Sequence, residues 1–387
     1  MAMNEKKERS DIQESIRHGA LSLARKTVTV GFDGFIDSVV KVVRHKDDQR
    51  TSYFESIQAF GKYIVEKGDK NFSLELEEFT TKLGGNMAIT ANALSHLGLS
   101  VSCIGSLGYP QIHPVFQQMP PNCKLHSFAN PGVSKVLEFT KGKVMLAEME
   151  ALNRITWEFI RDRIGVDTFI DLFSKSDLVA LLNWSEMDNS TAIWKGILRD
   201  VLPGLMRSKR SIGFFDLSDC SKRTDESIRE AIGLIKEFSS YWDVVLSLNL
   251  NEAAIIHSVL TGKKWNEDQV EEICEDIFDK LTIDTVVIHY AQQSVARNAH
   301  GLHKRNSFFI KTPAISCGSG DNFNAGFCMG RLLDLDAGAS LVLGHATSNL
   351  YMQSAQSPTI SQIIDFLSGN HAGKTAVSIP VANRQAL

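Results

Sequence analysis

The chain has 387 residues, of which 43% are hydrophobic, and its 41 Lys and Arg residues stand against 45 Asp and Glu residues. The resulting net charge of −4 does not favour nucleic acid or an anionic membrane surface as a partner. No apolar run approaches the ~20 residues of a membrane span, and the charged segment Met1–Arg17 lacks the apolar core of a signal peptide. We therefore expect a soluble, cytoplasmic protein with neither a nucleic-acid partner nor a membrane partner.

Residues 1–26 form a polar leader, in which we expect a helix around Ile12–Ala24. From residue 27 to the end at 387, short runs rich in Val and Ile alternate with longer amphipathic segments. Short apolar runs separated by helices are typical of a parallel sheet covered on both faces, so we predict a doubly wound α/β domain. The expected strands are Thr27–Gly31, Val101–Ile104, Leu178–Leu182, Ser211–Phe215, Asp243–Leu248 and Thr285–His289. The expected helices are Met87–Leu97, Thr191–Val201, Glu226–Phe238, Glu252–Leu260, Val270–Leu281, Phe323–Leu333, Gly338–Gln353 and Ile360–Leu367.

Two insertions, Ser38–Phe54 and Cys123–Met149, interrupt this alternation of predicted strands and helices, and both contain alternating apolar and polar residues. The second continues across Lys141-Gly142, as expected of a hairpin with glycine in its turn. We predict that the insertions form a small antiparallel sheet that acts as a lid over a site at the strand ends. The alternative is that they are edge strands of the main sheet.

The run Gly318-Ser319-Gly320-Asp321 directly precedes an apolar helical segment. Small residues allow a ligand to approach the backbone closely, and the free N–H groups of a helix N-terminus attract a phosphate. Asp321, in the first turn, would then lie beside a reacting phosphate and could accept a proton from an attacking hydroxyl. The alternative is a glycine-rich turn in which Asp321 only caps the helix.

A second glycine pair, Gly84-Gly85, precedes Asn86 at the start of another predicted helix. Asn86 can both donate and accept hydrogen bonds, which suits a sugar hydroxyl, although it could equally be an N-cap. Two acids, Asp33 and Asp37, follow the first predicted strand, at the edge where α/β sheets bind ligands. Their alternative is two loop acids in solvent.

Asn249 and Glu252 follow the strand Asp243–Leu248, again at a carboxyl end. An amide and a carboxylate in this position could orient a hydrated Mg²⁺ ion. The alternative is an N-cap with an acid in the first turn of the next helix.

Taken in order, these segments resemble the ribokinase-like (PfkB) carbohydrate kinase family over nearly the whole chain, from about Val28 to Leu367. Two regions carry the resemblance: Gly84-Gly85-Asn86 through Gly98 to Gly105, and Gly318-Ser319-Gly320-Asp321 through Phe327. The early acid Asp37 and the run from Asn249 to Glu252 complete the pattern.

The resemblance implies a role for each motif. Asp321 would deprotonate the sugar hydroxyl, and Gly318, Ser319 and Gly320 would form the anion hole. Sugar hydroxyls would be held by Asp37, Gly84, Gly85 and Asn86, with Asp33 beside them. Asn249 and Glu252 would position Mg²⁺ and the phosphates of ATP, the metal through water. Adenine would lie near the last strand and the helix Leu341–Gln353, and the lid would mediate a homodimer.

Two departures from the family pattern affect these expectations. Ile315 stands where an acid often precedes the glycine cluster, which weakens the implied monovalent cation (K⁺) site. Ile89 replaces a second asparagine three residues after Asn86, which should alter the sugar contacts.

The function we predict is therefore an ATP-dependent kinase acting on a hydroxyl of a small sugar. A nucleoside kinase of the same family is the first alternative, because the motifs do not separate ribose rings from hexoses. A catalytically silent sugar-binding or regulatory protein is the second, although Asp321 argues against it, since sensing alone needs no base.

Overall fold

The computed structural model describes residues 2–140, 142–206, 210–264, 269–310 and 313–369. Its main sheet has nine strands in the described residues, parallel from β6 to β12 and closed at one edge by an antiparallel hairpin, β13–β14. All six predicted strands are present in this sheet, whereas the hairpin was not predicted. In sheet order the strands are β14 (Gly301–Asn306), β13 (Gln293–Asn298), β12 (Thr285–His289), β11 (Trp242–Asn249), β10 (Ser211–Asp216), β9 (Leu178–Leu182), β1 (Thr27–Phe32), β5 (Ser100–Gly105) and β6 (Cys123–Ser127).

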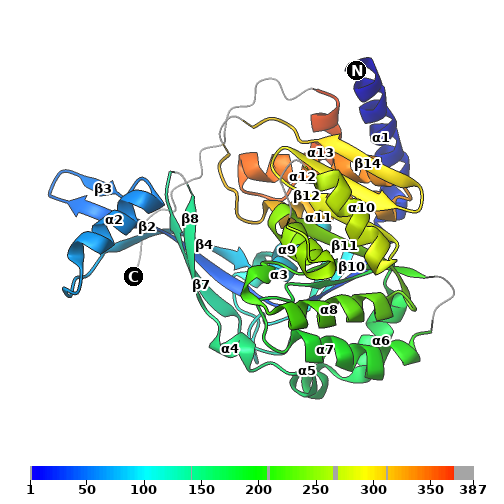
Figure 1. Cartoon of the computed structure of the whole chain (residues 1–387), viewed down its shortest axis with the longest axis horizontal. Coiled ribbons are helices and arrows are strands. Elements are labelled where there is room, and N and C mark those ends of the chain that lie inside the picture. The colour runs from blue at the N-terminus through cyan, green and yellow to red at the C-terminus, as the bar shows by residue number, and fades with distance from the viewer. Residues whose placement is uncertain (1, 141, 207–209, 265–268, 311–312, 370–387) are drawn as a thin grey trace.

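Helices cover both faces of this sheet, which confirms the doubly wound α/β prediction (Figure 1). Strand β9 illustrates the arrangement, because Val179 and Leu181 join one hydrophobic cluster while Leu178 and Ala180 join the other. Among the described helices, none is long and apolar enough to cross a membrane. One face carries α5 (Trp157–Ile164), α6 (Val166–Lys175), α7 (Ser190–Gly196), α8 (Asp225–Phe238), α9 (Leu250–Thr261) and α10 (Val270–Leu281). The other carries α1 (Ala2–Leu23), α3 (Asn86–His96), α11 (Ser319–Leu332), α12 (Ala337–Ser354) and α13 (Ile360–Leu367).

The segment predicted as a polar leader forms helix α1, which packs on the domain. Ile12, Ile16 and Leu23 are at most 3% exposed and belong to the second hydrophobic cluster. The Gln13 side chain also donates a hydrogen bond of 2.6 Å to the carbonyl oxygen of Ile364 in α13.

A second sheet forms a lid that projects from the main domain, together with helix α2 (Ile57–Lys67) (Figure 1). Its pairings are antiparallel except for β2–β7, which is parallel. The lid has its own small core, in which Phe54 packs edge-on against Phe60 and Tyr63. The lid strands are β2 (Phe35–Lys46), β3 (Thr51–Tyr53), β4 (Leu76–Gly84), β7 (Gly132–Glu138) and β8 (Lys143–Glu148).

The boundary predicted for the second insertion, Cys123–Met149, is wrong at its start. Cys123–Ser127 is strand β6, which pairs in parallel with β5 at the edge of the main sheet, so the lid portion begins at Gly132. The lid also contains β4, which was not predicted because most of its residues are exposed and polar. Lys141, in the predicted hairpin turn, lies outside the described residues, while Gly142 has the positive φ of +87° expected there.

Candidate functional site

Two cavities lie at the carboxyl edge of the main sheet. The inner cavity, of about 550 Å³, lies between the lid and the strand ends. The outer cavity, of about 850 Å³, is lined by the β12–β13 turn, by residues 307–310 and by α12. Asn249, His289 and Gly320 line both, so the two cavities meet at the N-terminus of α11.

Asp33 holds the start of α3 and lies beneath the wall of the inner cavity. Its carboxylate accepts hydrogen bonds from the backbone N–H groups of Asn86 and Met87, at 3.0 and 2.8 Å, and from the Asn183 side chain at 2.5 Å. The residue has no exposed surface, and its burial raises the pKa to about 7. The predicted contact of Asp33 with sugar would require Asp33 to line the inner cavity, and it does not. Asp33 instead positions Asn86, which lines this cavity.

The glycine pair before α3 is required by the two buried acids. A Cβ atom on Gly84 would lie 2.4 Å from the Asp37 carboxyl group, and one on Gly85 would lie 2.7 Å from Oδ2 of Asp33. Gly85 also has a φ of +87°, which other residues rarely adopt. The glycines thus let the backbone approach both carboxylates closely.

We predict that Gly85→Ala lowers the free energy of unfolding by about 1–3 kcal/mol, because it combines backbone strain with a clash at Asp33. The matched control is Gly233→Ala in α8, where an added Cβ meets nothing within 4 Å and φ is not positive. That control should gain about 0.5–1 kcal/mol. Urea unfolding of both variants measures the difference, and equal stabilities would contradict the role given to Gly85.

Asp37 lies on the lid strand β2 and lines the inner cavity, with an exposure of 2%. Lys82 on β4 and Ser134 on β7 are its cross-strand neighbours. Burial raises the pKa of Asp37, while the charge of Lys82 opposes this shift. The Lys82 ammonium is itself buried without a hydrogen-bond partner among the described residues, so the two charges depend on each other.

Asp321, in the first turn of α11, lines the inner cavity and directly follows Gly320, which lines both cavities. It is 7% exposed, and the hydroxyl of Thr90 in α3 lies 3.5 Å from its carboxylate. Burial raises the pKa of Asp321 well above its ordinary value, and the charges of Asp216 and Asp33 add to the shift. A carboxylate with a raised pKa is a stronger base, which suits it to accept a proton from a hydroxyl.

The N-terminus of α11 offers free backbone donors beside Asp321. Gly318 precedes the helix with φ of +90°, and a Cβ atom on it would lie 2.8 Å from the Tyr351 hydroxyl. The Ser319 N–H donates to the Ser316 carbonyl at 3.2 Å, whereas those of Gly320 and Asp321 have no acceptor within the described chain. Of the three residues predicted to form an anion hole, Gly318, Ser319 and Gly320, Ser319 therefore has its N–H already engaged, and the anion hole itself stays a prediction.

Sequence reasoning missed three further acids of the inner cavity: Asp216, Asp219 and Glu186. Asp216, at the end of β10, accepts hydrogen bonds from the Ser218 N–H at 2.9 Å and from the Asn324 side chain at 2.6 Å. Burial raises the pKa of Asp216. Its position at a strand end was the signal that could have identified it.

Asn249 and Glu252 form a reciprocal capping box at the start of α9. The Asn249 side chain accepts the Glu252 N–H at 2.9 Å, and Glu252 accepts the Asn249 N–H at 2.9 Å and its side-chain amide at 2.5 Å. Burial, followed by the charge of Asp216, raises the pKa of Glu252 well above its ordinary value. The capping alternative is therefore what the geometry shows, and the buried carboxylate also faces the inner cavity.

The donor set fits a hydrated magnesium ion rather than a directly ligated one. Among the described residues, no three His, Cys, Asp or Glu side chains are grouped closely enough to hold a metal. However, Asp216, Asp219 and Glu252 all line the inner cavity, and the pKa of Glu252 is raised first by burial and then by the charges of these two neighbours. A divalent cation bound through water would offset that repulsion.

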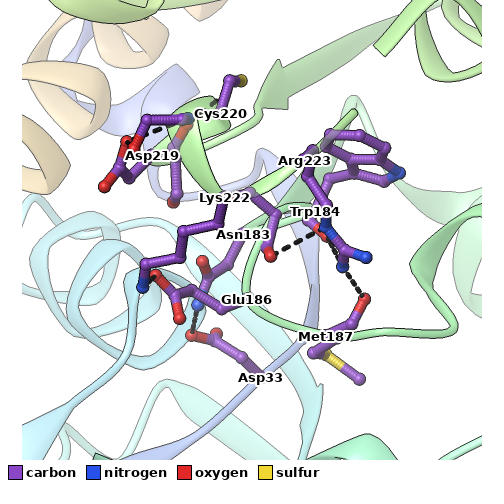
Figure 2. A network of polar contacts seen from close by, with 12 residues as sticks. Asp33, Asn183, Trp184, Glu186, Met187, Asp219, Cys220, Lys222 and Arg223 are labelled. Atoms are coloured by element: carbon purple, nitrogen blue, oxygen red, sulfur yellow. Dashed lines mark hydrogen bonds and ion pairs between the residues drawn. The ribbon is translucent and has the colours of Figure 1, made fainter. Parts of the chain in front are cut away.

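Arg223 holds in place the loop of residues 183–189, which connects β9 to α7 and borders the inner cavity (Figure 2). Arg223 donates to the carbonyl oxygens of Ser185 at 3.0 Å and of Met187 at 2.6 Å, and its guanidinium lies 5.1 Å from the centroid of the Trp184 ring. The loop carries Glu186, which pairs with Lys222, and both of these side chains line the cavity.

Two side-chain oxygens on this wall are buried without a hydrogen-bond partner among the described residues: Oδ1 of Asn183 and Oγ of Ser218. Both residues have a positive φ of 60°, although neither is glycine. Buried polar groups are normally satisfied, and strained residues cluster at functional sites, so these atoms are suited to a polar ligand.

The fold and the site together define a ribokinase-like carbohydrate kinase: a doubly wound sheet, a lid rooted beside the acids Asp37 and Asp321, and a glycine-rich helix start where two cavities meet. Solved structures agree with this class. A probable sugar kinase from Rhizobium etli has a TM-score of 0.61 at 14% identity, over 89% of this chain and 98% of that one. The ribokinase of Thermotoga maritima has a TM-score of 0.57 at 15% identity, over 88% and 98%. At such identities the likeness establishes the fold.

Sequence comparison identifies the family. A family model described as prokaryotic ketohexokinase matches residues 5–370. A ketohexokinase of Haloferax volcanii is 26% identical over 345 residues, which cover 88% of this chain and 91% of the relative. The chain belongs to the prokaryotic ketohexokinase family, and it is an ATP-dependent sugar kinase.

Proposed function

We propose that this kinase transfers the γ-phosphoryl group of ATP from the outer cavity to a hydroxyl of a ketohexose in the inner cavity. The observation that carries the proposal is the position of Asp321. This buried carboxylate lines the inner cavity one residue after Gly320, which lines both cavities, and it lies beside free N–H groups of a helix N-terminus. The choice of a ketohexose rests on the description of the family and on the Haloferax relative.

In the proposed reaction the acceptor hydroxyl gives its proton to the Asp321 carboxylate while its oxygen attacks the γ-phosphorus. The new O–P bond forms as the bond to the β–γ bridging oxygen breaks, and ADP leaves with that electron pair. The free N–H groups of Gly320 and Asp321 stabilise charge on the transferred phosphoryl oxygens. Burial lowers the pKa of His289 to about 4, so at pH 7 a neutral imidazole lines both cavities, where the phosphoryl group would pass between them.

Mg²⁺ would neutralise charge on the donor phosphates, and a structure of a putative ribokinase II from E. coli in complex with ATP and Mg²⁺ belongs to the same fold. Glu252 and Asp216 are the residues that we propose to hold its water molecules. A monovalent cation is not part of the proposal. Ile315 offers only a hydrocarbon side chain, and its N–H donates to the Met352 carbonyl at 3.3 Å.

The inner cavity favours an uncharged polyhydroxy acceptor. Its described lining contains six carboxylates but only two lysines, Lys143 and Lys222, and so repels an anionic acceptor such as a sugar phosphate. The unpartnered oxygens of Asn183 and Ser218 would accept hydrogen bonds from sugar hydroxyls. An ADP-release assay with ketohexoses, aldohexoses, sugar phosphates and nucleosides tests this choice. Turnover of nucleosides alone would restore the nucleoside-kinase alternative, which neither the family model nor the curated relative supports.

We predict that Asp321→Asn lowers kcat by at least about a hundredfold, because the variant cannot accept the hydroxyl proton. Since the pKa of Asp321 is raised, the wild-type enzyme should lose kcat/KM for sugar as the pH falls through a value above the ordinary 3.8, and the variant should lack this limb. Steady-state rates from pH 4 to 9 measure both effects. Calorimetry should show that the variant still binds both substrates, and near wild-type turnover would refute the assignment of the base.

We further predict that Asp37→Ala weakens sugar binding at least about tenfold while leaving ATP binding unchanged. The carboxylate would lose hydrogen bonds to hydroxyls, which are worth about 1.5–3 kcal/mol each when one partner is charged. Separate calorimetric titrations with sugar and with ATP measure the two affinities. An equal loss for both ligands would mean that Asp37 acts only as the structural partner of Lys82.

We also propose that a second copy of this chain covers exposed apolar surface of the lid. The lid exposes large apolar side chains, among them Phe79 at 52% and Leu146 at 56%. Light scattering after size-exclusion chromatography should give a dimer for the wild type and a monomer for Leu146→Glu. The matched control is Met206→Glu, at an apolar residue that is 82% exposed outside the lid. A wild-type monomer, or an unchanged mass for Leu146→Glu, would exclude this interface.

A further inference from the structure

A third cavity, of about 1110 Å³, lies between helix α1, strand β14 and the start of α12. Ser307 and Phe308 line this cavity and also the outer cavity, which is the proposed ATP site. These two residues therefore form a single layer of polypeptide between the cavity beside the N-terminal helix and the proposed ATP site. We refer to Ser307 and Phe308 as the shared wall.

Helix α1 contacts the shared wall and the strand leading into it through two successive residues. The Arg9 guanidinium lies 5.0 Å from the centroid of the Phe308 ring, within the range of a cation–π contact. Glu8 pairs with Arg305 near the end of β14, where Arg305 Nε donates to the Glu8 carboxylate at 3.0 Å. Both side chains of that pair are 31% exposed, so water screens it only in part.

Phe308 is also held from the side of the main domain. The ring of Phe366 in α13 packs edge-on against it, with centroids 4.7 Å apart and planes at 85°. The Phe308 carbonyl accepts a hydrogen bond of 3.0 Å from the side chain of Asn349. Asn349 lies on α12 and lines the outer cavity, so the position of Phe308 and the shape of that cavity are connected.

We propose that α1 is a nucleotide-affinity element, in which Arg9 is a positioning residue that keeps Phe308 in place as a wall of the ATP site. The inference rests on the proposed function in so far as the outer cavity is the donor site. Arg9 does not line the outer cavity, so it acts through Phe308. The helix itself is anchored independently by Ile12, Ile16 and Leu23, so removing the Arg9 side chain leaves α1 in position.

The test is calorimetric titration of the full-length chain with MgATP, without sugar, for the wild type, Arg9→Ala and Arg9→Lys. Arg9→Ala should weaken ATP binding about two- to tenfold, the range that one cation–π contact supports, and Arg9→Lys should restore part of the loss. Phe308→Leu, which removes the ring, should weaken ATP binding to a similar degree. The matched control is Arg17→Ala, at an exposed arginine of the same helix, which should leave the affinity unchanged.

Steady-state kinetics separate positioning from stability. We expect Arg9→Ala to raise KM for ATP by the same factor, with kcat at saturating ATP and KM for sugar unchanged. A lower melting temperature with an unchanged affinity for ATP would overturn the proposal, since α1 would then only stabilise the fold. Because ATP binding is measured without an acceptor, failure to phosphorylate any ketohexose would refute the proposed function without affecting this result.

Discussion

The buried carboxylate of Asp33 ties together the elements on which the site depends. It accepts two N–H groups at the start of α3 and the side-chain amide of Asn183, at the end of β9, and it follows β1 directly. Helix α3 packs against α11, so this one carboxylate sets how Asn86 and Thr90 face Asp321. The first N–H groups of a helix lack acceptors within the helix, and a buried carboxylate is costly without hydrogen-bond donors. The N–H groups of α3 and the Asp33 carboxylate therefore satisfy each other.

The same edge of the sheet concentrates negative charge that the protein alone does not neutralise. Asp216, Glu252 and Asp321 are all at least 93% buried, and burial raises the pKa of each. The charges of neighbouring acids raise the pKa values of Glu252 and Asp321 further. Such a cluster costs stability in the unliganded protein. A bound divalent cation would offset this cost, which is consistent with the proposed arrival of Mg²⁺ together with the nucleotide.

The sequence predicted the parts of the site that short motifs encode, and it did not predict the parts that the topology brings together. Gly318 to Asp321 and Gly84 to Asn86 are contiguous runs whose residue types limit what the backbone can do, so their positions at helix starts could be inferred. Asp216 is the last residue of strand β10 and Asn183 directly follows strand β9, and only the parallel register of these strands places the two residues in one cavity. Asp33 and Asp37 looked equivalent in sequence, yet one faces a helix start and the other faces the inner cavity.

The lid is joined to the main sheet in a way that has a physical consequence for sugar binding. The chain leaves the main sheet at the end of β1 and enters the lid at Phe35, with Asp33 and Gly34 between the two. Asp37, Ser134 and Lys143 belong to lid strands, whereas Asn183, Asp216 and Asp321 belong to the main domain, and all six line one cavity. A sugar that contacts both groups acts as a crosslink between two sheets that the chain joins through a short connection. Sugar binding should therefore restrict the motion of the lid relative to the main domain. A sugar that contacts both sides of the inner cavity should restrict this motion more than a sugar that contacts only one side.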